Sequence, residues 1–78
     1  MLLRCKIDGL LLPAQPCQQA GDLIAWDGME PFTLERVEAV FYELLSATSD
    51  EQLWLERNGY RLLKPADDFQ CEQLPLRA

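Results

Sequence analysis

The sequence predicts a small α+β domain, in which an antiparallel sheet of three to four strands is covered on one face by a single amphipathic helix. Two observations lead to this fold class: apolar residues recur at helical spacing between residues 34 and 47, and Asn58-Gly59 separates two apolar runs. The elements are expected in the order β-β-α-β-β. A chain of 78 residues is expected to form one compact domain over residues 1–64, followed by a partly ordered tail over 65–78.

The N-terminal part is predicted to contain strands. Residues 2–7 alternate between apolar and polar side chains, and Asp8-Gly9 is a turn signal that would lead back into a short strand over residues 10–12. Residues 13–21 contain two prolines, three glutamines and a glycine, a composition that predicts a loop. Residues 22–26 are apolar on both faces, as in a short covered strand.

The central segment is predicted to form the helix. Thr33 is the expected N-cap, and Phe32 before it could pack on Val37. Polar residues from Ser46 to Asp50 compete for backbone hydrogen bonds and should end the helix. The apolar residues that place one helix face on the core are Leu34, Val37, Val40, Phe41, Leu44 and Leu45.

A β-hairpin is predicted to follow. Residues 53–57 and 60–64 flank Asn58-Gly59, a pair typical of type I′ turns because both central residues must adopt positive φ. With this turn, Glu56 would lie opposite Arg61. We expect the face that meets the helix to consist of Leu53, Leu55, Tyr60 and Leu62.

Charge and size restrict the partners. Thirteen acidic and seven basic residues give a net charge of −6, which disfavours non-specific binding to nucleic acid or to an anionic membrane and favours a protein partner, especially a basic one. A chain this short buries a small core, so a homodimer is an open alternative.

The cysteines indicate a reducing compartment. Cys5, Cys17 and Cys71 show no Cys-x-x-Cys spacing and the chain has no histidine, so no metal site is expected. An odd cysteine count argues against a secreted disulfide scaffold, although a Cys5–Cys17 bridge stays open. The apolar runs near the N-terminus are too short for an export signal or a membrane span. We therefore expect a cytoplasmic protein.

Catalysis is not expected. Without histidine, the common serine and cysteine nucleophile mechanisms lose their usual base. No pair of carboxylates or tyrosines stands in a recognisable acid-base arrangement. The glycines form no phosphate-binding motif. We therefore expect neither an enzyme nor a cofactor.

A candidate interaction surface lies along the predicted helix. It combines an aromatic side chain with carboxylates that have no basic neighbour at helical spacing, which suits contact with a basic protein. The alternative is an ordinary solvated helix face, the default for exposed charge. The residues of this surface are Glu35, Glu38, Ala39, Tyr42 and Glu43.

A second candidate surface lies on the predicted hairpin, where Trp54, Arg57, Arg61 and Lys64 could contact nucleic acid. The net negative charge argues against that use. The function expected from the sequence is therefore a non-enzymatic protein-protein interaction or regulatory module. The first alternative is a small acidic inhibitor that mimics nucleic acid, of the type carried by phages and mobile elements, and the second is nucleic-acid binding through residues 53–64.

Overall fold

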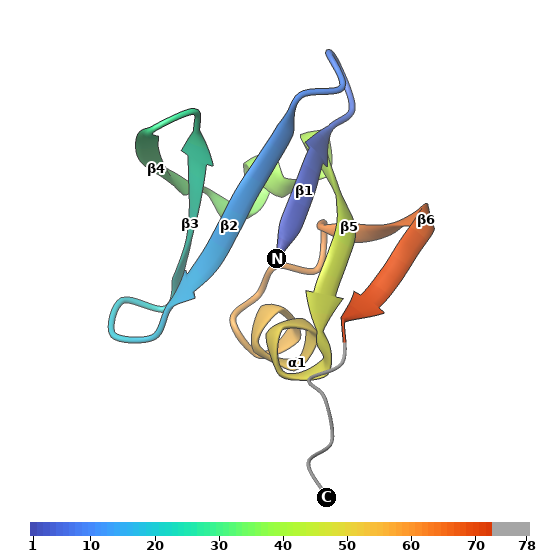
Figure 1. Ribbon diagram of the computed structural model, residues 1–78. Coiled ribbons are helices and arrows are strands. Elements are labelled where there is room, and N and C mark those ends of the chain that lie inside the picture. Colours follow the sequence, from blue (N-terminus) through green and yellow to red (C-terminus); the bar gives the residue numbers. More distant parts are fainter. Residues whose placement is uncertain (73–78) are drawn as a thin grey trace, which may run out of the picture.

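A single six-stranded sheet and one α-helix make up the computed structural model, which describes residues 1–72 (Figure 1). The strand order is β4-β3-β2-β1-β5-β6, with all neighbours antiparallel except β5 and β6. The strands are β1 (Leu2–Cys5), β2 (Leu11–Cys17), β3 (Asp22–Asp27), β4 (Glu30–Leu34), β5 (Tyr42–Thr48) and β6 (Lys64–Glu72), and the helices are the 3-10 helix η1 (Arg36–Phe41) and α1 (Ser49–Arg57).

The predicted α+β class is confirmed, but the predicted strand number and element order are wrong. Five strands precede α1, and one strand follows it. The connection through α1 makes β6 parallel to β5, since a helical crossover returns the chain to the same end of the sheet. Residues 65–72 of the expected tail lie in β6, and residues 73–78 lie outside the described part of the chain. Neither helix in residues 1–72 is long and apolar enough to cross a bilayer.

The predicted N-terminal hairpin is confirmed. Its turn is longer than expected, because the Cys5 N–H donates to the Leu10 carbonyl at 2.8 Å and closes four residues between them. Gly9 has a φ of 76°, which glycine adopts at little cost. Ile7 consequently lies in the turn and is 79% exposed, so it is not part of the strand.

The loop predicted for residues 13–21 is wrong over residues 13–17, which belong to strand β2. Its first half, to Pro13, pairs with β1, and its second half, from Ala14 to Cys17, pairs with β3. Apart from Ala14, which also exchanges hydrogen bonds with the backbone of Met1, each half therefore has a paired strand on one side only. Proline is tolerated in such edge-like positions because no ladder donor is needed on the open side.

The predicted strand over residues 22–26 is confirmed as β3. Gly28, with a φ of 65°, and Met29 form a two-residue turn into β4, in keeping with the preference for glycine at the first central position of a type II′ turn. Thr33 is not a helix cap, because it lies in β4 opposite Ile24.

The predicted helix over residues 34–47 is wrong, and its apolar spacing has another origin. Leu3 and Leu2 of β1 lie opposite Leu44 and Ser46, so Leu45 is an extra residue in β5. This bulge shifts the core-facing positions from a spacing of two to a spacing of three, at Leu44 and Ala47. Two extended segments and the short helix η1 thus reproduce the periodicity of a helix.

The predicted hairpin over residues 53–64 is also wrong, because its first half is α1. Asn58 caps the helix and Gly59 follows with a φ of 84°. The Gly59 N–H donates to the Glu56 carbonyl at 3.4 Å, and the Tyr60 N–H donates to the Leu55 carbonyl at 2.9 Å. This pair of bonds is the Schellman motif, in which glycine takes the left-handed position that ends a helix.

Helix α1 begins at a capping box. The Thr48 hydroxyl accepts from the Glu51 N–H at 3.1 Å, while the Glu51 carboxylate accepts from the Thr48 N–H at 2.9 Å. These bonds satisfy backbone donors that the first helical turn leaves free. The helix therefore starts at the polar stretch that was predicted to end one.

Removing this cap should destabilise the protein measurably. The variant Thr48→Ala is expected to lower the free energy of unfolding by about 1 kcal/mol, because a backbone donor loses its acceptor. Urea unfolding followed by circular dichroism measures the change. The control is Ser49→Ala, since the exposed Ser49 hydroxyl has one hydrogen-bond partner within residues 1–72, the Cys71 sulfur at 3.7 Å. Equal midpoints for Thr48→Ala and the unmodified protein would contradict the assigned cap.

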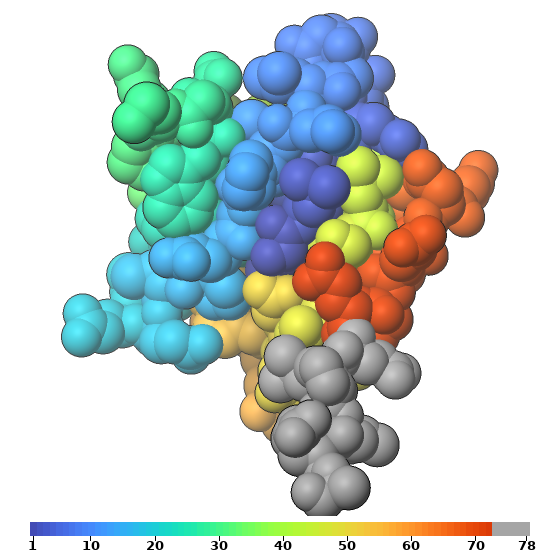
Figure 2. Space-filling view, in the orientation of Figure 1, coloured from blue at the N-terminus to red at the C-terminus, as the bar shows by residue number. Residues whose placement is uncertain are grey.

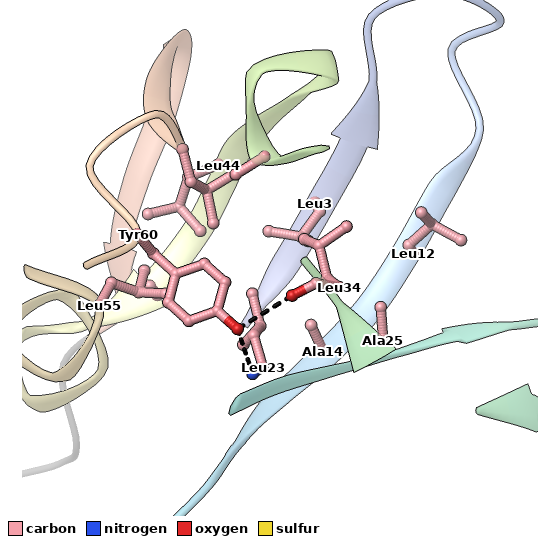
Figure 3. Close-up of a cluster of buried hydrophobic side chains, with 12 residues drawn as sticks. Leu3, Leu12, Ala14, Leu23, Ala25, Leu34, Leu44, Leu55 and Tyr60 are labelled. Carbon is pink, nitrogen blue, oxygen red and sulfur yellow. Dashed lines mark hydrogen bonds between the residues drawn. The ribbon is translucent and has the colours of Figure 1, made fainter. Parts of the chain in front are cut away.

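The core lies between the sheet, η1, α1 and the segment after α1. Tyr60 is its largest fully buried side chain (Figure 3). The Tyr60 hydroxyl accepts from the Leu23 N–H at 2.7 Å and donates to the Leu34 carbonyl at 2.9 Å. The other members of the core are Leu3, Leu12, Ala14, Leu23, Ala25, Leu34, Ala39, Leu44, Ala47, Leu55 and Leu63.

Candidate functional site

The first predicted surface is divided by the structure. Glu35 and Glu38 are exposed at η1, whereas Ala39 is fully buried and belongs to the core rather than to an exposed surface. Tyr42 and Glu43 begin β5 and are half-buried. No single helix face carries these residues.

Glu43 is neutralised by a residue distant in sequence. The Arg4 Nε lies 2.8 Å from a Glu43 carboxylate oxygen, and the same guanidinium lies 3.2 Å from Asp68. Hydrogen bonds to Glu43 and then to Asp68 raise the pKa of Arg4. Glu43 therefore stabilises the contact between β1 and β5, and Arg4 also reaches β6.

An apolar surface at one end of the sheet was missed by the sequence analysis. It comes from the β1–β2 turn with the first residue of β2, from the β3–β4 turn and from η1, which lie towards the upper end of the molecule in Figure 1. The exposed fraction reaches 95% for Met29, 79% for Ile7 and 74% for Val37. We call this surface the apolar end, and its residues are Ile7, Leu10, Leu11, Met29, Val37, Val40 and Phe41.

A backbone hydrogen bond joins two of the three parts of the apolar end. The Lys6 N–H donates to the Phe41 carbonyl at 2.8 Å, so the β1–β2 turn is joined to the last residue of η1. In the space-filling view the β1–β2 turn forms the top of the molecule, with the β3–β4 turn beside it (Figure 2). The surface is thus built on hydrogen-bonded turns rather than on one element.

Acidic groups surround the apolar end. They come from all three of its segments and are exposed: Asp8, Asp27, Glu30, Glu35 and Glu38. Within residues 1–72, none of the five forms an ion pair. The apolar end therefore has a rim with an excess of negative charge, although the exposed Lys6 lies in the β1–β2 turn beside it.

The pKa of Tyr42 is affected by part of this negative charge. Its pKa is raised above the usual value, first by burial and then by the charges of Cys5, Glu38, Asp8 and Asp27. The hydrogen bond from the Leu10 N–H, at 3.0 Å, is the main cause that lowers the pKa of Asp8, and the Cys5 side chain adds to it. Charges from the first hairpin, from the end of β3 and from η1 thus all raise the pKa of the Tyr42 phenol.

The second predicted surface does not exist as a hairpin. Trp54 stacks on Tyr60 with ring centroids 5.7 Å apart and helps to cover the core. Arg57 lies in the last turn of α1, while Arg61 and Lys64 lie beside a cavity after that helix. The ribbon-like arrangement assumed for nucleic-acid contact is therefore absent from residues 53–64.

A polar cluster that the sequence did not indicate centres on Arg36. Its Nε donates to the Asn58 carbonyl at 2.6 Å, its Nη1 lies 3.3 Å from Asp22, and its Nη2 donates to the Gly21 carbonyl. The guanidinium also lies 4.8 Å from the centre of the Tyr60 ring. These contacts connect the β2–β3 turn with the end of α1, which is a structural role.

In the part of the chain that the structure describes, the cysteines and carboxylates form neither a disulfide nor a metal-binding group. Cys5, Cys17 and Cys71 are free thiols there, and no group of three or more Cys, Asp or Glu side chains is placed to hold a metal ion. No protein-family model matches the chain, and neither a curated protein nor a solved structure is significantly similar to it.

Proposed function

We propose that this protein is a non-catalytic module that binds another protein through the apolar end. One observation carries the proposal: of the nine large apolar side chains exposed in residues 1–72, seven lie at this end. Scattered exposed apolar residues are normal on a monomer, whereas a concentration of them bounded by polar groups is typical of an interaction surface.

The charge around this surface favours a basic partner. A rim of carboxylates attracts positive charge over about 10 Å at moderate ionic strength and sets the orientation of the encounter, while the apolar residues supply the buried contact. The partner expected is therefore a protein with an apolar patch bordered by Lys and Arg. The free thiols favour a reducing compartment, and we propose the cytoplasm as the location.

Mimicry of nucleic acid is the second candidate function. It is supported by the unpaired carboxylates of the rim, which could occupy the phosphate positions of a basic groove. The apolar residues between these carboxylates favour an ordinary protein interface, since phosphate positions are separated by polar sugar groups. If mimicry is the function, a duplex oligonucleotide will compete with this protein for the captured partner.

The test is affinity capture from the native cell with variants matched in chemistry. Ile7→Ser and Val37→Ser should each lose most of a stoichiometric partner, because each removes a strongly exposed apolar contact. Mass spectrometry identifies the partner, and its recovery relative to the unmodified protein measures the loss.

The controls are Leu53→Ser and Leu62→Ser, whose side chains are both 44% exposed but lie outside the apolar end. These variants should keep the partner. Loss of the partner in all four variants, or in none of them, would exclude the apolar end as the binding surface.

A further inference from the structure

Strand β3 is apolar on both of its faces, but the described part of the chain packs its core against only one of them. Leu23 and Ala25 are fully buried in the core. Ile24 and Trp26 alternate with them, so their side chains lie on the opposite face of the sheet. Both are half-buried, and neither belongs to the core or packs against it. A strand with two apolar faces is typical of a sheet that is covered on both sides.

The strands beside β3 extend this outer face without adding a charge. Gln15 of β2 and Thr33 of β4 lie on either side of Ile24, and Pro31 of β4 lies opposite Trp26. These strands form the half of the sheet that lies away from β6 (Figure 1). We call this surface the neutral face, and its residues are Pro13, Gln15, Ile24, Trp26, Pro31 and Thr33.

The neutral face differs from the rest of a chain in which 26% of the residues are charged. None of its six side chains ionises. Charged side chains that follow the same alternation are paired: Asp22 of β3 with Arg36, and Arg4 of β1 with Glu43 and Asp68. Two copies of this chain, each with a net charge of −6, repel each other. They can approach closely only through a surface of this kind, which brings no unpaired charge to the contact.

We propose that the neutral face packs against the neutral face of a second copy of this chain and forms a symmetric dimer. The same patch is used on both copies, with Trp26 near its centre. A patch three strands wide and four or five residues long covers on the order of 300 Å². This is less than the roughly 800 Å² per partner of a stable complex, so we expect a weak dimer. The dimer does not depend on the function proposed for the apolar end.

Sedimentation equilibrium of the full chain, from about 10 µM to about 1 mM, tests this self-association. The dissociation constant is expected to be about 0.1 mM. Added salt should strengthen the dimer several-fold, because it screens the repulsion between two acidic chains and leaves the apolar contact in place. Salt should have the opposite effect on a basic partner at the apolar end. The two kinds of binding are therefore distinguishable.

Charge variants locate the interface. Gln15→Lys and Thr33→Lys each place a cation at an exposed position of the neutral face and are expected to weaken the dimer about tenfold. Each also makes the chain less acidic, so a general effect of net charge would strengthen association instead. The matched control is Gln70→Lys, at an exposed position of β6, the strand at the other edge of the sheet. It should leave the dimer at least as strong.

The two tryptophans give a second measurement on the unmodified chain. In a nitrogen-15 spectrum, the indole N–H signal of Trp26 should shift as the protein concentration rises. The indole signal of Trp54 should not shift, because this side chain stacks on Tyr60 and packs against the core.

Three results would overturn the proposal. The first is a monomer at about 1 mM, both at low salt and with added salt. The second is a dimer of Gln15→Lys and Thr33→Lys that is as strong as that of Gln70→Lys. The third is a set of concentration-dependent shifts confined to residues 6–11 or 36–41, which would place the contact on the apolar end instead.

Discussion

The variant Tyr60→Phe is expected to lower the free energy of unfolding by about 1–3 kcal/mol, although it removes a single oxygen atom. Leu23 and Leu34 lie opposite each other in β3 and β4, and the Tyr60 hydroxyl bonds to the N–H of the first and the carbonyl of the second. All three residues are at most 1% exposed, so water cannot replace the hydroxyl.

Urea unfolding measures this loss, and an unchanged m-value would show that stability rather than compactness has changed. Tyr42→Phe is the control, because the Tyr42 hydroxyl makes no hydrogen bond to another residue among those the structure describes. It should change the free energy of unfolding by less than about 0.5 kcal/mol. The assigned role of the Tyr60 hydroxyl is wrong if the two phenylalanine variants are equally stable.

The variant Arg36→Met is expected to lower the free energy of unfolding by about 1.5–3 kcal/mol. Methionine keeps much of the aliphatic length but loses the guanidinium that bonds to the carbonyls of Gly21 and Asn58 and lies over the Tyr60 ring. The side chain is 41% exposed, so water offsets part of the loss and the lower part of the range is expected.

Lysine at position 36 should recover little of this stability. It keeps the positive charge, but an ammonium group cannot reproduce the planar set of donors that reaches both carbonyls. Arg57→Met is the control for loss of an exposed cation and should stay within about 0.5 kcal/mol of the unmodified protein. Thermal unfolding compares the four proteins, and full rescue by Arg36→Lys would show that charge alone matters.

Local turn chemistry was informative at the N-terminal end of the chain. The alternation before Asp8-Gly9 predicted the β1–β2 hairpin, and the apolar run after Gly21 predicted β3. Both signals act within a few residues, because a turn with positive φ and a period of two are decided by sequence neighbours. The overall α+β class is confirmed as well, although the helix over residues 34–47 and the hairpin at Asn58-Gly59 from which it was predicted are both wrong.

Asn58-Gly59 shows why other local signals were ambiguous. The pair favours a type I′ hairpin turn, but the same freedom to adopt positive φ suits the end of a helix. The deciding signal was Thr48-x-x-Glu51 upstream, a capping box that marks a helix start nine residues before Arg57 ends the helix. Read together, these signals predict α1, so this error could have been avoided from the sequence.

The bulge at Leu45, by contrast, could not have been predicted from local sequence signals. Its apolar neighbours at a spacing of three follow a helix pattern, and only pairing with β1 makes Leu45 the extra residue of a strand. The error carried over to the candidate surface: Val37, Val40 and Phe41 were assigned to a buried helix face, whereas they are exposed on η1. The apolar end could not be found while its members were placed in the core.

The sequence by itself determined the first hairpin, β3 and the excess of negative charge, because each depends on composition or on residues that are near neighbours. Tertiary structure decided the partner of every other strand, the burial of Tyr60 and the position of Arg36. The hydrogen bonds of Tyr60 and Arg36 join residues that are 14 to 37 positions apart. The exposed apolar end and the neutral face exist for the same reason: each is assembled from segments that only the folded sheet brings together.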